Sequence, residues 1–179
     1  FILGIDGPTA SGKTTLANKI SKKLKKKFNV VTFALDWTLT DRNKRRRYIK
    51  DYVSKKINFF YELEEHMHIS KAEKFLDKID KFNNNSESYS FKVTVENLYN
   101  RNDQGRINLK KTFDINRNTV LIIEGHYSGY TDLSNKIDLN LLLLGDSDEL
   151  LKRKIKRVKD YRNSNDAVDY FNKIDIPSY

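Results

Sequence analysis

The sequence lacks cysteine and contains only two prolines among its 179 residues. The absence of cysteine excludes a disulfide framework and a thiolate metal site, and it fits a reducing cytoplasm. No apolar run approaches the roughly 18 residues that a membrane span requires, and no secretory leader precedes the first apolar segment. With 38% hydrophobic residues, we expect a single cytoplasmic domain over residues 1–179, which starts inside an apolar run as a fragment of a longer protein would.

Acidic residues are scarce relative to basic ones, since 24 Asp and Glu stand against 34 Lys and Arg and leave a net charge of +10. A basic surface is the usual electrostatic footprint of a nucleic-acid binder. The lysines are nevertheless scattered over helix faces, and we expect the densest run, residues 22–28, at the solvated end of the first helix. We therefore expect a small-molecule partner rather than nucleic acid. The net charge by itself does not exclude nucleic-acid binding.

A phosphate-binding motif stands near the start of the chain. Gly7-x-x-x-x-Gly12-Lys13-Thr14 matches the Walker A pattern and falls between an apolar run and an amphipathic segment. Its glycines let backbone amides face phosphates, Lys13 reaches the β and γ phosphates, and Thr14 offers its hydroxyl to Mg²⁺. We expect ATP and Mg²⁺ to bind here. The candidate nucleotide-binding residues are Gly7, Thr9, Ala10, Ser11, Gly12, Lys13, Thr14 and Thr15.

Four short apolar runs predict buried strands at residues 1–5, 30–35, 119–123 and 137–144. Apolar residues at helical spacing over residues 14–27 separate the first two runs and complete a βαβ unit. This order predicts an α/β protein with the P-loop NTPase fold, in which helices flank a mostly parallel, doubly wound sheet. The ligand site of such a sheet lies at the carboxyl ends of its strands.

Three further segments complete the predicted architecture. Residues 38–80 carry apolar residues between many charges and are expected to be mostly helical. Residues 91–113 alternate apolar and polar side chains around a turn at 102–105, which predicts a β-hairpin that we interpret as a flap beside the sheet. Residues 147–162 begin with a capping serine and two acids and then become strongly basic, which predicts a lid-like helix.

Acidic residues follow two of the predicted strands. Asp36 ends the second strand, where a carboxylate can accept the proton of an attacking hydroxyl and touch the substrate; the alternative is an N-cap for the next helix. Glu124 ends the third strand, where it can hold Mg²⁺ together with Thr14; the alternative is a structural hydrogen bond into the loop.

Basic residues are the other candidates for phosphate chemistry. Arginines of the lid-like helix and its exit can stabilise a transferred phosphoryl group, and the alternative is a solvated helix face. Arg42 is the candidate substrate contact among four arginines after Asp36, the others being expected in solvent. The catalytic candidates besides Asp36 are Lys13, Arg153 and Arg157, and Arg162 is a nucleotide-binding candidate.

The three histidines are unequal candidates for metal binding or substrate contact. His66 and His68 are two residues apart and therefore lie on different faces of a helix, so the sequence does not favour a zinc site. His126 follows Glu124 and Gly125 at a strand end. It is a candidate substrate contact, and the alternative is packing within the loop.

Four motifs in this order resemble the uridine kinase and phosphoribulokinase family of P-loop kinases: GIDGPTASGKTT, LDW, IIEGHY and DLNLLLLGDSDELLKRKIKRVKDYR. The resemblance covers roughly residues 2–162. It implies that Asp36 is the base, that Thr14 and Glu124 lie at magnesium, and that the hairpin lies on the acceptor side. The arginines that it implies for the lid region are Arg153, Arg157 and Arg162.

The acceptor end departs from the family's pattern. Trp37, Thr38 and Leu39 stand where the nucleoside kinases continue with Ser-Phe-Tyr, and the His-Pro-Asp-Ala-Phe element of their nucleoside site is absent. His126 stands where an apolar residue is usual, and Val158 replaces an aspartate that commonly follows the lid arginine. The resemblance therefore supports the phosphate end more strongly than the acceptor end.

These observations predict an ATP- and Mg²⁺-dependent phosphotransferase that moves the γ-phosphate to a hydroxyl of a small molecule. By resemblance the leading acceptor is a nucleoside such as uridine or cytidine, followed by a sugar, a sugar phosphate or a vitamin alcohol. Two alternatives remain open: a polynucleotide 5′-hydroxyl kinase, and a module in which ATP orders a partner-binding surface without turnover. The sequence also leaves the oligomeric state open, a homo-oligomer included.

Overall fold

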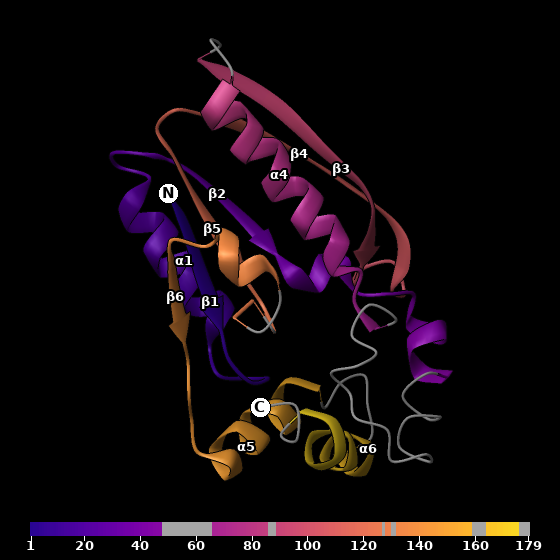
Figure 1. The fold of residues 1–179 in the computed structure, drawn as a ribbon. Helices are drawn as coiled ribbons and strands as arrows, with labels where there is room; N and C mark the ends of the chain where they lie inside the picture. Colours follow the sequence, from indigo (N-terminus) through magenta and orange to yellow (C-terminus); the bar gives the residue numbers. More distant parts are fainter. Residues whose placement is uncertain (48–65, 86–88, 127, 130–131, 159–163, 176–179) are drawn as a thin grey trace.

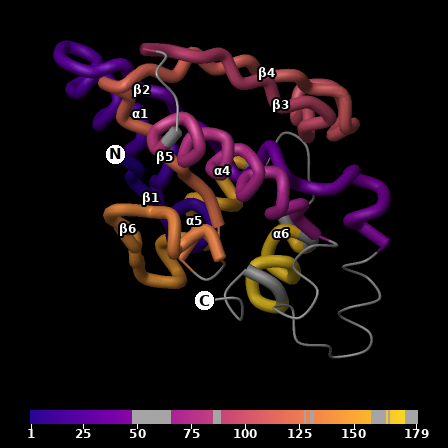
Figure 2. The backbone as a smooth tube through the Cα atoms, turned by 45° about the horizontal axis from the view of Figure 1, so that its top comes forward, coloured from indigo at the N-terminus to yellow at the C-terminus, as the bar shows by residue number. Residues whose placement is uncertain are grey.

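The computed structural model describes residues 1–47, 66–85, 89–126, 128–129, 132–158 and 164–175 (Figures 1 and 2). Residues 42–47 form a short helical segment. The other elements are, in chain order, β1 (Ile2–Asp6), α1 (Lys13–Leu24), β2 (Asn29–Ala34), η1 (Leu35–Thr38), α4 (Ile69–Asn85), β3 (Ser90–Asn100), β4 (Arg106–Asn116), β5 (Thr119–Glu124), η3 (Asp132–Lys136), β6 (Leu139–Leu142), α5 (Ser147–Val158), α6 (Ser164–Tyr170) and η4 (Phe171–Asp175).

A parallel sheet with the strand order β2-β5-β1-β6 forms the centre of the described structure. Its register places Ile5 of β1 and Ala34 of β2 on either side of Glu124 in β5. The carboxyl ends of three neighbouring strands therefore meet at one edge of the sheet. The P-loop NTPase fold with a mostly parallel, doubly wound sheet is confirmed.

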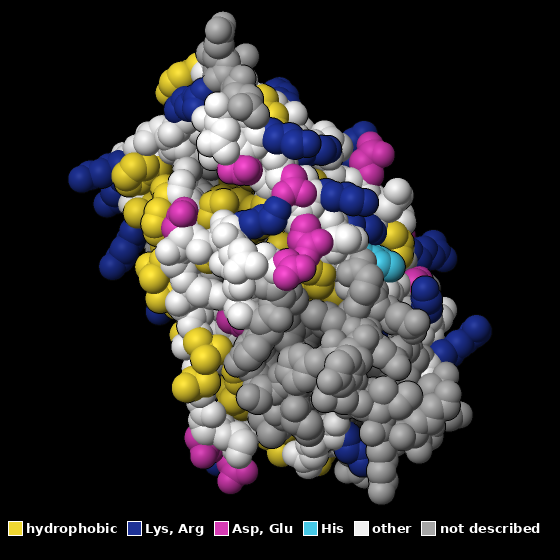
Figure 3. Space-filling model, viewed as in Figure 1, with side chains coloured by type: hydrophobic (Ala, Val, Ile, Leu, Met, Phe, Trp, Pro, Cys, Tyr) yellow, Lys and Arg dark blue, Asp and Glu magenta, His cyan; other side chains and the backbone are white. Residues whose placement is uncertain are grey.

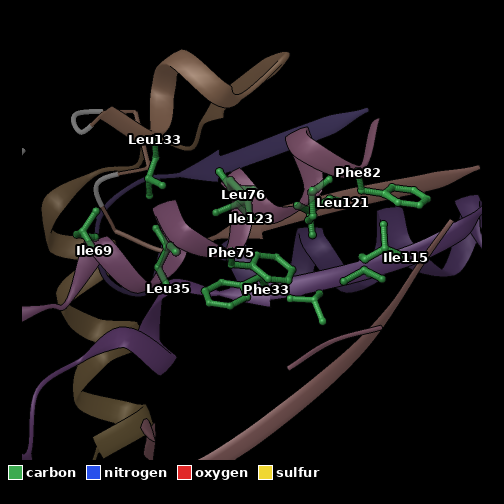
Figure 4. Close-up of a cluster of buried hydrophobic side chains, with 14 of the residues drawn as sticks. Phe33, Leu35, Ile69, Phe75, Leu76, Phe82, Ile115, Leu121, Ile123 and Leu133 are labelled. Atoms are coloured by element: carbon green, nitrogen blue, oxygen red, sulfur yellow. The ribbon is translucent and has the colours of Figure 1, made fainter. Parts of the chain in front are cut away.

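Helices cover both faces of the sheet because its central strands are apolar on both sides (Figure 1). On one face, Ile5 and Ile122 pack with Ala17 of α1. On the other face, Ile123 packs in a cluster with Phe75 of α4, and Figure 4 shows this layer. Neighbouring residues of β5 thus point to opposite faces, as the two-residue period of a strand requires.

The hairpin of β3 and β4 lies against α4 and β2 (Figures 1 and 2). Aromatic rings make this contact. The ring centroid of Phe113 in β4 lies 6.0 Å from that of Phe33 and 5.1 Å from that of Phe75. Trp37 joins this cluster with its centroid 5.6 Å from Phe33. Each such pair contributes about 0.5–1.5 kcal/mol beyond area burial, so the aromatic cluster fixes the hairpin beside the segment that follows β2.

Several predicted boundaries change in the structure. The prediction of a mostly helical segment over 38–80 is wrong at residues 39–41 and 67–68, which are not helical. Residues 48–65 lie outside the described residues, and α4 runs on to Asn85. The first helix ends at Leu24 because the chain turns there towards β2. The hairpin strands reach from Ser90 to Asn116. The lid-like helix is described as far as Val158.

The fourth strand differs most from its prediction, since β6 covers Leu139–Leu142 and is not buried. Within the described sheet β6 pairs with β1 alone, and the side chains of Leu139 and Leu142 are 50% and 48% exposed. A run of apolar residues predicted a strand covered on both faces, whereas the position of β6 at the edge of the described sheet leaves it open.

The surface in Figure 3 carries lysine and arginine side chains dispersed among acidic, polar and apolar ones. They do not gather into one basic patch on the part of that face which the structure describes. None of the helices in the described part of the chain combines the length and the apolar composition of a membrane-spanning segment.

Candidate active site

The phosphate-binding loop, residues 7–14, leaves the end of β1 and runs into α1. Gly7 and Gly12 have φ angles of 140° and 98°, which glycine adopts without a steric penalty. A Cβ atom at Gly7 would lie 2.3 Å from the backbone oxygen of Leu143, so side chains are excluded there by packing as well. The loop also carries Ala10 in the left-handed region, with a φ of 63°.

Lys13 is buried within this loop, with 8% of its surface exposed. Its Nζ donates hydrogen bonds to the backbone oxygens of Gly7 at 2.7 Å and Pro8 at 2.8 Å. Burial lowers the pKa of Lys13, and the charges of Asp36 and Glu124 partly oppose that shift. A buried ammonium is stabilised by anionic oxygens more than by carbonyls, so the loop suits a phosphate group.

The side chains of Thr14, in the first turn of α1, and Glu124, at the end of β5, are in contact. The Thr14 hydroxyl donates to the two carboxylate oxygens of Glu124 at 3.2 and 3.1 Å. Burial of Glu124, and next the charge of Asp36, raise the pKa of Glu124. One hydroxyl and one carboxylate, with phosphate oxygens and waters, form the oxygen-rich set that Mg²⁺ prefers. The described residues contain no cluster of three or more His, Asp or Glu side chains that could hold a metal ion by themselves.

Asp36 lies in η1, directly after the end of β2. Its Oδ2 atom accepts a hydrogen bond from Arg101 Nη2 at 2.5 Å, and 39% of its side chain is exposed. The N-cap alternative does not hold, because Asp41 caps residues 42–47 through the amides of Asn43 and Lys44. Asp36 follows Ala34, the register partner of Glu124, by two residues, so the candidate base lies at the edge of the sheet that carries the phosphate-binding loop, and its charge acts on Lys13 and Glu124.

The lid arginines separate in the structure. Arg157 Nη2 donates to the hydroxyl of Thr9 at 3.1 Å, which brings the end of α5 to the phosphate-binding loop. Arg153 instead pairs with Glu149 at 3.9 Å on the exposed side of α5. Arg162 lies outside the described residues.

The two candidate substrate contacts, Arg42 and His126, lie near different groups. Arg42 donates through Nε and Nη2 to the Tyr99 hydroxyl, each at 3.3 Å. His126 is close enough to Lys13 for the lysine charge to act on it; burial first, and then this and other positive charges, lower the pKa of His126. His66 is also buried, and burial together with the charge of Arg45 lowers its pKa to about 3, so it is neutral at physiological pH.

The remaining loop residues are placed more simply. Ser11 lies within the loop, its hydroxyl oxygen is buried and it has no hydrogen-bond partner among the described residues. Thr15 is exposed in the first turn of α1. Both positions are compatible with contact to a nucleotide, and neither contact is tested by the structure.

Sequence reasoning missed two contributors. Asp6 is buried at the end of β1, where its carboxylate accepts hydrogen bonds from the amides of Gly7 at 2.6 Å and Gly129 at 2.9 Å and so ties two loops together. An acid in an apolar strand was the signal for it. Arg101 carried no such signal, because its partner Asp36 is 65 positions away in the chain.

Comparison with known proteins agrees with this geometry. The model of the phosphoribulokinase/uridine kinase family matches residues 2–174. A uridine kinase of Ureaplasma parvum serovar 3 is 31% identical over 169 residues, which cover 91% of this chain and 71% of the relative. A uridine kinase of Ureaplasma urealyticum serovar 10 is 30% identical over 167 residues, which cover 89% and 69%.

Two solved structures show the same fold at low sequence identity. D-glycerate 3-kinase from Cryptococcus neoformans var. grubii superposes with a TM-score of 0.64 at 16% identity, over 100% of this chain and 77% of that one. Phosphoribulokinase from Rhodobacter spheroides superposes with a TM-score of 0.62 at 12% identity, over 99% and 63%.

Proposed function

The chain belongs to the phosphoribulokinase/uridine kinase family, and on this premise we propose that it transfers the γ-phosphate of ATP to a hydroxyl of a small molecule. One observation carries the proposal. The ends of three neighbouring parallel strands bring Lys13, the Thr14–Glu124 pair and Asp36 together at one edge of the sheet.

The phosphate end is assigned to the loop and the end of α5. Lys13 would leave the carbonyls of its own loop for phosphate oxygens, and Arg157, which already contacts the loop at Thr9, would face the same group. Thr14 and Glu124 would hold Mg²⁺, whose chemistry is to neutralise negative charge on the phosphates. ATP and Mg²⁺ are parts of the proposal that rest on this oxygen and cation arrangement.

Asp36 is assigned as the base. The acceptor's hydroxyl oxygen forms a bond to the γ-phosphorus, the bond from that phosphorus to the bridging oxygen of ADP breaks, and the hydroxyl proton passes to the Asp36 carboxylate. Arg101 occupies Oδ2 of this carboxylate in the structure, which leaves Oδ1 for the hydroxyl.

The acceptor belongs to the nucleoside and sugar class by relationship. Uridine is the first nucleoside to test, because the Ureaplasma relatives are uridine kinases. Neither the dispersed basic residues nor the family adds support for the polynucleotide kinase or for the ATP-gated module. The experiment below distinguishes both alternatives from the proposed function.

The test measures ADP formation from Mg-ATP, alone and with nucleosides, sugars, sugar phosphates, hydroxy acids, vitamin alcohols and a 5′-hydroxyl oligonucleotide. We expect one small molecule to stimulate turnover. Asp36→Asn should then lower kcat by about 10²–10⁴, the usual contribution of a general base, with ATP binding retained. Asp114→Asn is the matched control, since Asp114 is an exposed acid of β4 paired with Lys92.

Other results would point elsewhere. Full transfer activity in Asp36→Asn would contradict the assignment of the base. Stimulation by the oligonucleotide alone would favour the polynucleotide kinase. ATP binding without any acceptor-dependent turnover would favour the ATP-gated module.

A further inference from the structure

A cluster of arginines surrounds a buried tyrosine next to the candidate base. Tyr99 of β3 is 3% exposed, and its hydroxyl accepts hydrogen bonds from Arg42 at 3.3 Å and from Arg45 Nη2 at 3.2 Å. The Arg45 guanidinium also lies 4.8 Å from the centre of the Tyr99 ring. Two half-buried cations therefore converge on one neutral oxygen.

These two charges have no anionic partner in the described structure. The described side-chain contacts of Arg42 and Arg45 are with Tyr99 and the backbone oxygen of Thr40, and none is with a carboxylate. The nearby acid Asp41 is engaged by the amides of Asn43 and Lys44. Like charges at short range repel each other, and a phenol offsets little of that repulsion.

The pKa of Tyr99 is consistent with this excess of positive charge. Burial alone would raise it, but the hydrogen bonds and charges of Arg45 and Arg42 outweigh burial and lower it. The environment around the tyrosine hydroxyl thus favours a negative charge.

The turn of the hairpin connects this cluster to Asp36. The backbone oxygen of Gly105 accepts a hydrogen bond from the Arg42 amide at 3.2 Å, and a Cβ at Gly105 would lie 2.6 Å from the Tyr99 hydroxyl. The turn is therefore packed directly on Arg42 and Tyr99. Arg101 begins the same turn and pairs with Asp36, so the turn that packs on the cluster also brings a guanidinium to the candidate base.

We propose that Arg42 and Arg45, which converge on the Tyr99 hydroxyl, bind a phosphate or carboxylate group of the acceptor together with Arg101 of the adjoining turn. This inference rests on the proposed function and narrows its acceptor class to negatively charged molecules, such as a sugar phosphate or a hydroxy acid. A guanidinium fork matches either anion in geometry. The acceptor's anion would draw Arg101 from Asp36 and leave that carboxylate to the hydroxyl.

The experiment compares acceptors that differ in one charged group. Ribose is compared with ribose 5-phosphate and glycerol with glycerate, alongside uridine, by measuring kcat/KM in the full chain. We expect one charged member to exceed its neutral counterpart and uridine by about 100-fold, because Arg42 and Arg45 are half-buried cations that only a charged ligand would pair. Which pair shows the preference tells phosphate from carboxylate.

Arg45→Gln should remove about tenfold of that preference, mainly through the KM of the charged acceptor, and should leave neutral acceptors within about threefold. Arg46→Gln is the matched control, because Arg46 is exposed on the same helical segment. A uridine preference in the wild type, or an equal loss for charged and neutral acceptors in Arg45→Gln, would overturn the inference while leaving the kinase function intact.

A binding measurement keeps the inference testable without turnover. Inorganic phosphate is titrated by calorimetry into the protein saturated with Mg-ADP. Binding that weakens about tenfold in Arg45→Gln and is unchanged in Arg46→Gln supports the anion site. Absence of binding, or equal binding in both variants, contradicts it. Failure of every acceptor to stimulate ADP formation would instead remove the proposed function.

Discussion

The phosphate half and the acceptor half of the proposed site are assembled in different ways. The phosphate half takes Lys13 and Thr14 from one short motif and Glu124 from the adjacent strand, and Lys13 and Glu124 are buried. The acceptor half takes Asp36 from a helical turn and Arg101 from a distant hairpin, and 61% of the Arg101 side chain is exposed.

Because of this difference, we expect members of the family to share the phosphate half and to vary in the acceptor half. A loop held by a parallel sheet has little freedom, so its residues are set once the motif is present. The turn that carries Arg101 lies outside the parallel sheet, so an exposed residue of this turn can be exchanged without disturbing the sheet. The acceptor half is therefore where specificity is expected to differ among members of this fold, and it can be tested apart from the phosphate half.

The largest expected effect comes from removing the cation of the phosphate half. Lys13→Met should lower kcat/KM by about 10³ for every acceptor, since a buried cation aimed at the transferred group is lost. Lys19→Met, on the exposed side of α1, is the control and should be near wild type. Steady-state kinetics with two acceptors measures the effect, and a loss confined to one acceptor would contradict the division into two halves.

The next effect tests which lid arginine belongs to the phosphate half. Arg157→Gln should lower kcat by about 30-fold because Arg157 reaches the phosphate-binding loop. Arg153→Gln should change kcat less, because an exposed pair with Glu149 contributes little. The two variants carry the same chemical change on one helix, so equal losses would show that α5 contributes through both arginines.

The residues assigned to the phosphate half could be named from the sequence for a physical reason. Walker A glycines and the acids at strand ends have their roles set by local backbone geometry, so Lys13, Thr14 and Glu124 could be named in advance. The acceptor half depends on contacts between segments far apart in the chain. Arg101 was not named, because nothing near residue 101 indicates that its turn meets Asp36.

The same limit explains the errors in the fold. The apolar run of β6 indicated a strand correctly but could not tell a central strand from one at the edge of the described sheet. The apolar residues between charges over 38–80 did not reveal that residues 39–41 are not helical and that Leu39 bridges to Met67, before α4. Tertiary pairing overrode local preference there.

The next prediction concerns the apparent affinity of the phosphate half for Mg²⁺, which should change about tenfold per pH unit. Because burial and Asp36 raise the pKa of Glu124, this carboxylate takes up a proton at a pH above the ordinary value of 4.5, and protonation removes a metal ligand. The apparent affinity for Mg²⁺ should therefore start to fall above pH 4.5 and decline about tenfold per pH unit below the raised pKa. Glu124→Gln should have weak affinity and lose this dependence, measured by Mg²⁺ titration of nucleotide binding at several pH values.

The smallest expected effect tests whether the acceptor half can be changed without affecting the phosphate half. Phe113 packs its ring on Phe75 and lies 6.2 Å from Trp37, the residue after Asp36. Phe113→Ala should lower the free energy of unfolding by about 2 kcal/mol, since the ring is only half-buried, and should raise the acceptor KM about threefold while the KM for ATP stays unchanged. Phe91→Ala removes a ring that packs on Phe82 instead, so it should cost similar stability without the change in acceptor KM. Denaturant unfolding and steady-state kinetics together decide the matter: equal shifts in both KM values for Phe113→Ala would mean that the hairpin supports the whole site, and the two halves could not then be varied independently.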